Sequence, residues 1–147
     1  MANPQVAQGT LNRVRGSIVY ADNPSLNITA PYLDAAGISM AFDNNAGVLL
    51  PTLTGGVTSP EPYQMCTLTV HILKTQGLAS TYKTQFETLV NVGDFQVITD
   101  AATLPNYSLS NGVLLGIQEL GFNGSQAGFV FRLQGIYYVN ASLFDLV

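Results

Sequence analysis

Charged residues are scarce in this sequence. Only 10% of the 147 residues are Asp, Glu, Lys or Arg, whereas about 25% is usual for a soluble domain. A monomer of this size normally carries charge over most of its surface to remain soluble. The shortage favours a surface that is largely covered, most simply by other copies of the same chain. The alternative is a monomer kept soluble by Asn, Gln, Ser and Thr.

Basic residues are fewer than acidic ones, and they do not cluster. The net charge is -4, and the five basic residues are dispersed along the chain: Arg13, Arg15, Lys74, Lys83 and Arg132. Nucleic-acid binding depends on grouped Lys and Arg side chains that neutralise phosphates. The sequence therefore gives little support to a protein that binds nucleic acid.

The residue types that carry out chemistry are also few. The only cysteine, Cys66, excludes a disulfide within the chain and is expected to be a small core residue. The only histidine, His71, excludes a His pair for a metal. A general base is compatible with its position, but a surface or interface histidine is favoured. No G-x-S-x-G motif occurs, and the Asp residues lack the spacing of a calcium loop. We expect no enzymatic activity, cofactor or metal.

Long apolar segments are missing as well. Residues 1–16 lack the apolar core of a signal peptide, and uncharged runs elsewhere are interrupted by Gly, Pro, Asn and Thr. We expect no membrane-spanning helix and a protein that is made in a reducing cytoplasm.

The strongest pattern that is present lies in residues 59–90. Side chains alternate from residue 65 to 73, which predicts a strand with one buried face. The apolar face comprises Cys66, Leu68, Val70 and Ile72, and the other face comprises Met65, Thr67, Thr69 and His71.

An amphipathic helix is predicted directly after this strand. Its apolar stripe is formed by Leu78, Tyr82, Phe86 and Leu89, at spacings of four, four and three residues. Lys83 and Glu87 are four residues apart beside the stripe, where they can form an ion pair.

The chain before this unit is expected to consist of strands and turns. Residues 1–12 indicate an N-terminal arm. Residues 13–21 and 26–30 predict a first hairpin, and residues 37–43 and 46–50 predict a second one around Asn44-Asn45. Residues 51–62, with Tyr63 after them, predict a long loop rich in Thr, Gly and Pro. Its low charge favours a loop that docks on a neighbouring molecule.

The chain after the helix also predicts strands. Asn91-Val92-Gly93 should stop the helix, and residues 94–100 should form a strand. Asn123-Gly124 is a strong signal for a two-residue turn that joins residues 113–122 to 125–140 and places Leu114 opposite Leu133. Both faces of this hairpin are largely apolar. The expected fold is one domain, residues 1–147, mainly β with one flanking helix.

Five segments together resemble the bacteriophage tail tube proteins, and more narrowly the small tube proteins of contractile-tailed phages. They are the opening QGTLNRVRGSIVYAD, the segment GISMAFDNNAGVLLPT, the SPEPY turn with its strand and helix, the FNG hairpin, and YYVNASLF. These features are patterns of structure, and none of them contains a catalytic residue.

The resemblance implies a definite assembly. Each subunit is a β-sandwich or partial barrel with a flanking helix, and six subunits form a ring whose inner strands join into one barrel. Rings stack into a hollow tube that encloses the tape measure protein and conducts DNA into the host, and a sheath surrounds the tube in contractile tails. The protein would be assembled in the host cytoplasm and reside in the virion tail.

The resemblance also gives three groups of residues a role. The residues expected to face the lumen are Ser39, Ala41, Asp43, Thr67, Thr69 and His71, together with Met65. The residues expected to contact the next ring are Thr52, Thr54, Thr58, Glu61 and Tyr63, in the segment 51–63. Lys83 and Glu87 are expected to face the sheath.

Other functions remain open from the sequence. A tail terminator and the tube protein of a bacterial injection machine belong to the same structural class. A sugar- or ligand-binding β-sandwich of a phage fibre or baseplate is the main alternative, which the seven Tyr residues permit and the absence of Trp disfavours. An enzyme is the least favoured class.

Overall fold

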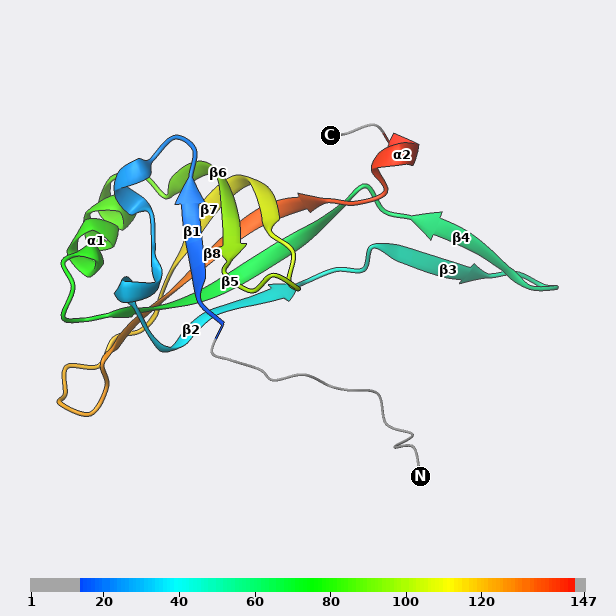
Figure 1. The fold of residues 1–147 in the computed structure, drawn as a ribbon. Coiled ribbons are helices and arrows are strands. Elements are labelled where there is room, and N and C mark those ends of the chain that lie inside the picture. Colours follow the sequence, from blue (N-terminus) through cyan, green and yellow to red (C-terminus); the bar gives the residue numbers. More distant parts are fainter. Residues whose placement is uncertain (1–13, 145–147) are drawn as a thin grey trace, which may run out of the picture.

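The protein is mainly β, and its strands form a curled sheet with one projecting hairpin (Figure 1). The computed structural model describes residues 14–144, so the expected N-terminal arm, residues 1–12, lies outside the described residues. The strands are β1 (Gly16–Tyr20), β2 (Leu33–Phe42), β3 (Gly47–Pro51), β4 (Gly56–Pro60), β5 (Tyr63–Leu73), β6 (Asn91–Thr99), β7 (Tyr107–Glu119) and β8 (Gly128–Tyr138). The helices are α1 (Leu78–Thr88), the one-turn α2 (Ala141–Phe144), and the 3-10 turns η1 (Pro24–Leu26) and η2 (Ala30–Tyr32).

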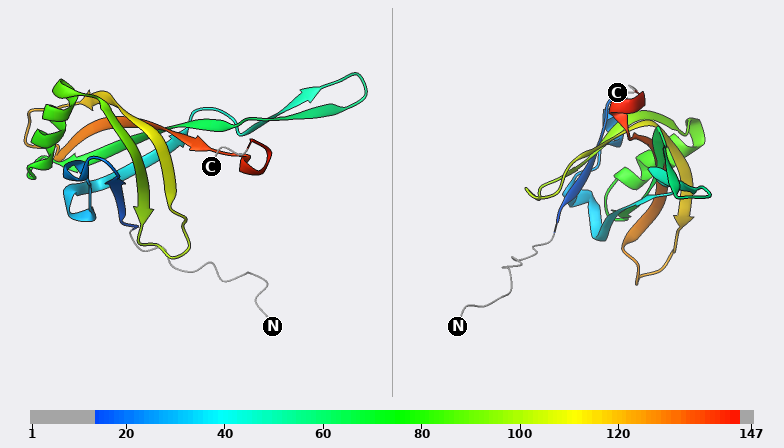
Figure 2. Two further views of the ribbon diagram at one scale, coloured as in Figure 1. Left: turned by 90° about the horizontal axis from the view of Figure 1, so that it is seen from above. Right: turned by 90° about the vertical axis from the view of Figure 1, so that its right-hand side faces the viewer.

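Six strands form one antiparallel sheet in the order β1-β6-β7-β8-β5-β2. The sheet curves strongly, so that it makes a half-barrel with α1 at one end (Figures 1 and 2). The two end strands, β1 and β2, therefore approach each other across the open side of the half-barrel. Within the part of the chain that the structure describes, no helix is long and apolar enough to cross a membrane.

The central strand of the sequence prediction, β5, is confirmed. It lies between β8 and β2, and the four side chains of its predicted apolar face are completely buried. Complete burial of a large aliphatic side chain contributes about 1.5–3 kcal/mol to the free energy of folding. The alternation in the sequence was therefore a correct guide to which face of β5 turns inward.

The predicted helix, α1, is also confirmed, except at its last apolar position. Leu78 and Tyr82 are buried, and Phe86 packs partly against the core. Leu89 follows the helix in an extended conformation and is 58% exposed. Asn91-Val92-Gly93 is not a separate helix stop, because β6 already begins at Asn91.

Tyr82 ties the helix to the rest of the core. Its hydroxyl donates to the carbonyl oxygen of Leu26 at 2.7 Å, which leaves its oxygen to accept from the hydroxyl of Tyr20 at 3.0 Å. Burial raises the pKa of both tyrosines, so both hydroxyls stay protonated and hold α1 against β1 and η1. The Tyr82 ring also packs on Phe131, with the ring centroids 4.3 Å apart.

Both hairpins predicted before β5 differ from the structure. In the first, only one bridge forms, between Ile18 and Ile28, because Pro24 and Pro31 direct the chain into the 3-10 turns η1 and η2. In the second, β2 pairs with β5 and not with the segment that follows it. Asn44 is not a turn residue there, since its side chain accepts from the Met65 amide at 2.6 Å.

The sequence predicted a long loop at residues 51–62, but part of this segment is a strand. Residues 56–60 form β4, which pairs with β3 in the register Val48 with Ser59 and Leu50 with Val57. A hydrogen bond of 2.8 Å from the Thr52 amide to the Gly55 carbonyl closes the turn. We call this hairpin, residues 47–60, the arm, and it projects well beyond the half-barrel (Figures 1 and 2).

The C-terminal hairpin forms, but with a longer loop than predicted. Leu114 lies opposite Leu133 as expected, whereas Ile117 and Glu119 are shifted by bulges to positions opposite Phe131 and Val130. Residues 120–127 connect the strands. Within this loop the Asn123 carboxamide oxygen accepts from the Ser125 and Gln126 amides, a local turn that replaces the two-residue hairpin turn.

Candidate functional site

Six of the seven residues expected to face a lumen lie together on one surface of the sheet, and the seventh, Met65, lies on the same side of β5 opposite Ile136. In the β2–β5 pair, Ser39 is opposite Thr69 and Ala41 is opposite Thr67. Strand β8 extends the same surface, with Arg132 opposite Thr69 and Gln134 opposite Thr67. We call this surface, which is opposite the core, the polar face; it comprises Ser39, Ala41, Asp43, Thr67, Thr69, His71, Arg132 and Gln134.

A hydrogen-bonded triad lies at the centre of the polar face. The Thr67 hydroxyl donates to Asp43 Oδ2 at 2.5 Å, and the Gln134 amide nitrogen lies 3.3 Å from the same oxygen. These contacts explain why Thr67 is only 7% exposed although it is polar. The triad links β2, β5 and β8, and therefore fixes the Asp43 carboxylate at the surface.

His71 is held by a contact with the backbone of β2. Its Nδ1 lies 3.1 Å from the Gly37 carbonyl oxygen, which can only accept, so Nδ1 carries the hydrogen. The side chain lines a hollow of about 290 Å³ whose other polar members include Asp34, Glu119 and Gln126. Within the described residues, no Ser, Thr or Cys side chain lines this hollow.

The polar face is almost neutral. Arg132 and Asp43 carry opposite charges, and no other Asp, Glu, Lys or Arg belongs to this face. Among residues 14–144, no three His, Cys, Asp or Glu side chains are grouped closely enough to hold a metal ion. The face can therefore act as a smooth, hydrated surface, but it offers no concentrated charge for binding.

Cys66 lies beneath the polar face, on the core side of β5. Burial, with a smaller contribution from the Asp43 charge, raises the pKa of its thiol to about 12. A thiol whose pKa is raised in the folded state stabilises that state below the unfolded-state pKa. This contribution is lost as the pH rises from about 8.5 towards 12.

We predict that Cys66 resists labelling in the folded protein. At pH 8, a maleimide or an aromatic disulfide should react about 100-fold more slowly, or slower still, than in urea-unfolded protein, because reaction requires local opening. The rate can be followed by mass spectrometry. Labelling at a similar rate in both states would show that β5 is not buried as described.

The arm carries three of the residues expected to contact a neighbouring ring. Thr52 and Thr54 lie in its turn and Thr58 lies on β4, all exposed. Glu61 and Tyr63 lie at its root instead. This region was predicted from the sequence, but its hairpin shape was not, because the pattern of residues 46–50 favoured pairing with residues 37–43.

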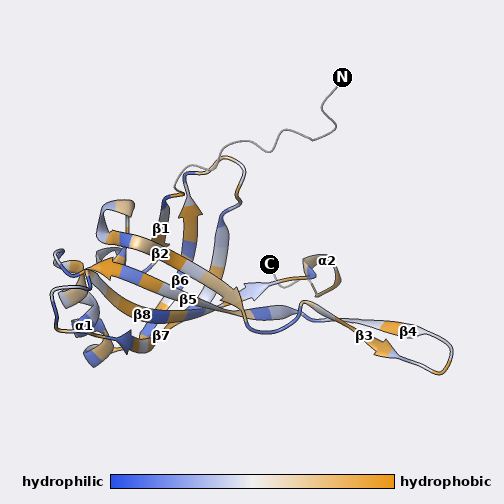
Figure 3. Cartoon of the chain, turned by 90° about the horizontal axis from the view of Figure 1, so that it is seen from below, coloured by the Kyte–Doolittle hydropathy of each residue, from blue (hydrophilic) through white to orange (hydrophobic). Residues whose placement is uncertain are grey.

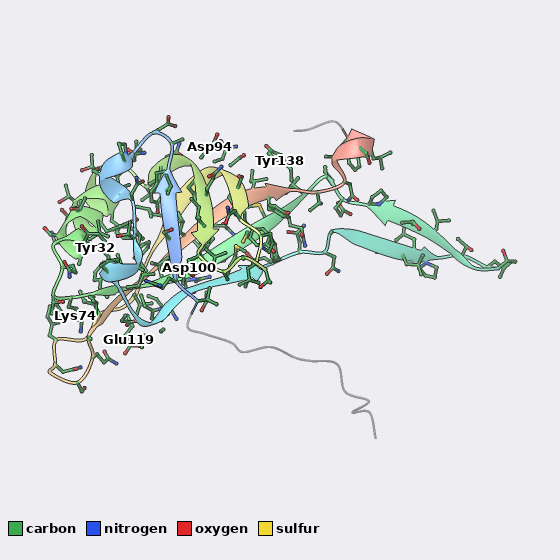
Figure 4. All side chains as sticks on the ribbon, viewed as in Figure 1. Tyr32, Lys74, Asp94, Asp100, Glu119 and Tyr138 are labelled. Atoms are coloured by element: carbon green, nitrogen blue, oxygen red, sulfur yellow. The ribbon has the colours of Figure 1, made fainter. Side chains whose placement is uncertain are left out.

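The root of the arm is held by hydrogen bonds from the C-terminal part of the chain. Asn140 Nδ2 donates to the carbonyl oxygens of Ala46 at 2.9 Å and Glu61 at 2.6 Å, one on each side of the hairpin. The Glu61 amide also donates to the Ala46 carbonyl at 2.9 Å. Tyr138 lies towards this root, whereas Lys74 and Glu119 lie at the opposite end of the body (Figure 4). These bonds fix the direction in which the arm points.

The arm is apolar and has no charge. Residues 46–60 contain no Asp, Glu, Lys or Arg, and the hydropathy view shows hydrophobic positions along both strands (Figure 3). Its exposed apolar side chains are Val48, Leu49, Leu50, Leu53 and Val57. An isolated two-stranded ribbon of this kind has no core of its own, and it exposes apolar surface that is usually covered by a partner.

The residues expected to face a sheath line an apolar groove. Lys83 and Glu87 form an exposed ion pair at 2.6 Å on α1. Between them and the C-terminal hairpin is a groove of about 370 Å³. We call it the helix groove, and its lining residues are Ala79, Ser80, Lys83, Phe86, Glu87, Ile117, Leu120 and Phe129.

The open side of the half-barrel forms a hollow of about 630 Å³. It lies between β1 with its neighbour β6 and the opposite end strand β2, and Leu33, Ile38, Met40 and Val97 contribute its apolar wall. Arg15 lies at its rim, where it pairs with Asp100 at 2.9 Å. The hydrogen bond from the Arg15 amide, assisted by the Arg15 charge, lowers the pKa of the Asp100 carboxyl.

The sequence analysis did not assign Arg132 and Gln134 to the polar face. No pairing between β5 and β8 was derived from the sequence, so the contribution of β8 to this face was not predicted. No protein-family model and no curated protein sequence matches this chain.

Proposed function

We propose that this chain is the structural subunit of a bacteriophage tail tube, in which hexameric rings stack into a hollow conduit for DNA. The observation that carries the proposal is the arm, an uncharged apolar hairpin held away from the body by hydrogen bonds at its root. A protein that works as a monomer gains nothing from such a surface, whereas a stacking subunit needs a feature that reaches the next ring.

The ends of the sheet support ring formation. β1 and β2 are end strands, and the outer edge of β1 is bridged to Ile28 at Ile18. An end strand with unpaired backbone groups, such as β2, invites pairing with another chain. Joining such strands between six subunits would produce one continuous barrel, in which few edges remain free. The open side of the half-barrel would then be covered by neighbouring subunits.

The polar face supports a role as the wall of the channel. DNA that must slide through a tube should not be held by it, and each phosphate contact from Lys or Arg adds affinity. The face contains only one such side chain, Arg132, and it also contains Asp43. A nearly neutral, hydroxyl-rich wall lets the tape measure protein and then DNA pass without specific binding.

The proposal places α1 towards the outside of the tube, where Lys83 and Glu87 would face a sheath if the tail contracts. It also places the protein in the virion tail, after assembly in the host cytoplasm. No catalytic activity and no cofactor are needed for this function.

The test is negative-stain electron microscopy of the purified protein before and after concentration. Sixfold rings or hollow tubes are the expected result. Dispersed monomers at high concentration, also in the presence of a tail-initiating complex, would contradict the proposal. A single type of ring that never stacks would indicate a tail terminator.

The second candidate is a ligand-binding module of a phage fibre or baseplate, and the hollow on the open side of the half-barrel favours it. Its volume lies in the range of about 300–1,000 Å³ that is usual for ligand pockets. Saturable binding of an oligosaccharide by a monomer or trimer would support this candidate, and loss of binding on Tyr107→Ala would locate the site in that hollow.

A further inference from the structure

The arm and the helix groove lie at opposite ends of the molecule. In Figure 1 the arm extends away from the half-barrel on the side remote from α1. Leu53, at the tip of the arm, is completely exposed, and Leu49 is 70% exposed. In the helix groove, Ile117 and Leu120 are about two-fifths exposed, at 41% and 38%. Each end therefore carries an apolar surface without a partner in the described chain.

We propose that the arm tip of one copy of this chain docks in the helix groove of the next copy. Leu53 would enter between Phe86 on α1 and Leu120 after β7, and Leu49 would cover the edge of the groove. The inference rests on the proposed function, which it deepens by assigning the surface that receives the arm.

Charge favours this groove over the hollow around His71. An uncharged arm cannot neutralise a charged side chain that it covers. Burying an unpaired charge costs several kcal/mol, so the arm should dock where charges are absent or already paired. The two charged residues of the helix groove, Lys83 and Glu87, already pair with each other at its rim. The hollow around His71 contains Asp34 and Glu119, and no Lys or Arg of the described chain lines it, so it fits the arm less well.

The positions of the two surfaces determine what kind of assembly the contact produces. A contact between different surfaces of identical chains is heterologous, and it propagates without limit unless it closes into a ring. A tip at one end and a groove at the other end thus produce continued addition of subunits along one direction. The same contact would account for the apolar character of both ends.

Cross-linking between single-cysteine variants tests the inference. Leu53→Cys and Leu120→Cys are made separately in the full chain, mixed under assembly conditions, and treated with a short bismaleimide. Both positions are exposed, and the buried Cys66 provides an unreactive background. Thr103→Cys, on the exposed loop between β6 and β7 and outside the groove, is the control partner for Leu53→Cys.

The expected result is that Leu53→Cys with Leu120→Cys forms cross-linked dimer at least about tenfold faster than Leu53→Cys with Thr103→Cys. The contact raises the local concentration of the second thiol to the millimolar range. A chain that carries both Leu53→Cys and Leu120→Cys should give a ladder of cross-linked multimers, because each copy can then react at both ends. Rings or tubes without preferential cross-linking would overturn the groove assignment and leave the tube proposal standing. Absence of both assembly and cross-linking would overturn both.

Discussion

Replacing Leu49 and Leu53 together by Ser should raise the concentration needed for assembly by about 100-fold or more. Burying a leucine side chain contributes about 1.5–3 kcal/mol, and each 1.4 kcal/mol changes an association constant about tenfold. These are the two most exposed leucines of the arm. Sedimentation velocity across a dilution series, with electron microscopy of the same samples, measures the threshold.

The folded monomer should be nearly unaffected by this double substitution. Both leucines lie on the arm rather than in the core, and surface changes usually alter the free energy of unfolding by less than about 0.5 kcal/mol. Leu89→Ser is the matched control, because it removes a leucine that is 58% exposed and lies outside both the arm and the helix groove. Assembly at the wild-type threshold by the Leu variant would rule out the arm as the stacking contact.

Replacing Phe131 by Ala should cause the largest loss of stability of any single change discussed here. Phe131 on β8 is completely buried, and its ring contacts those of Tyr82, Phe86 and Phe129. Truncation of a buried Phe costs about 3–5 kcal/mol through lost transfer energy and the cavity that remains. The total free energy of unfolding of a folded domain is only about 5–15 kcal/mol. We therefore expect the Tm to fall by roughly 10–15 °C.

Urea unfolding measured by far-UV circular dichroism tests this expectation. The midpoint should fall while the slope stays unchanged, as for a loss of native-state contacts alone. Val130→Ala is the control, because Val130 precedes Phe131 on the same strand and lies on the opposite, less buried face. Equal losses for both variants would mean that the two faces of β8 are not distinguished in the way the structure describes.

Local patterns in the sequence were sufficient for β5 and α1. The period of two in residues 65–73 and the apolar stripe from Leu78 to Phe86 are properties of neighbouring residues. The hydrophobic effect favours burial of such an apolar face whichever element of the fold covers it. The buried face of β5 and the Lys83–Glu87 pair were therefore predicted correctly.

The choice of strand partners could not be predicted in the same way. Asn44-Asn45 favours a local hairpin, but β2 instead pairs with β5, where Met40 lies opposite Leu68. Because β2 pairs with β5, β3 pairs with β4 instead of β2. The segment expected to be a loop therefore forms part of the arm. Partner choice depends on the total apolar surface buried by the whole sheet, which no short window of sequence contains.

The sequence by itself determined the low charge, the strand-helix unit and the side chains that lie on each face of β5. Only the tertiary structure decided that β8 completes the polar face, that the arm projects, and that Ile117 and Leu120 meet α1 in a groove. The physical reason is that side-chain alternation is fixed by backbone geometry at each residue. Strand pairing and bulges are instead fixed by contacts between residues far apart in the chain, as in the Thr67 and Gln134 pair.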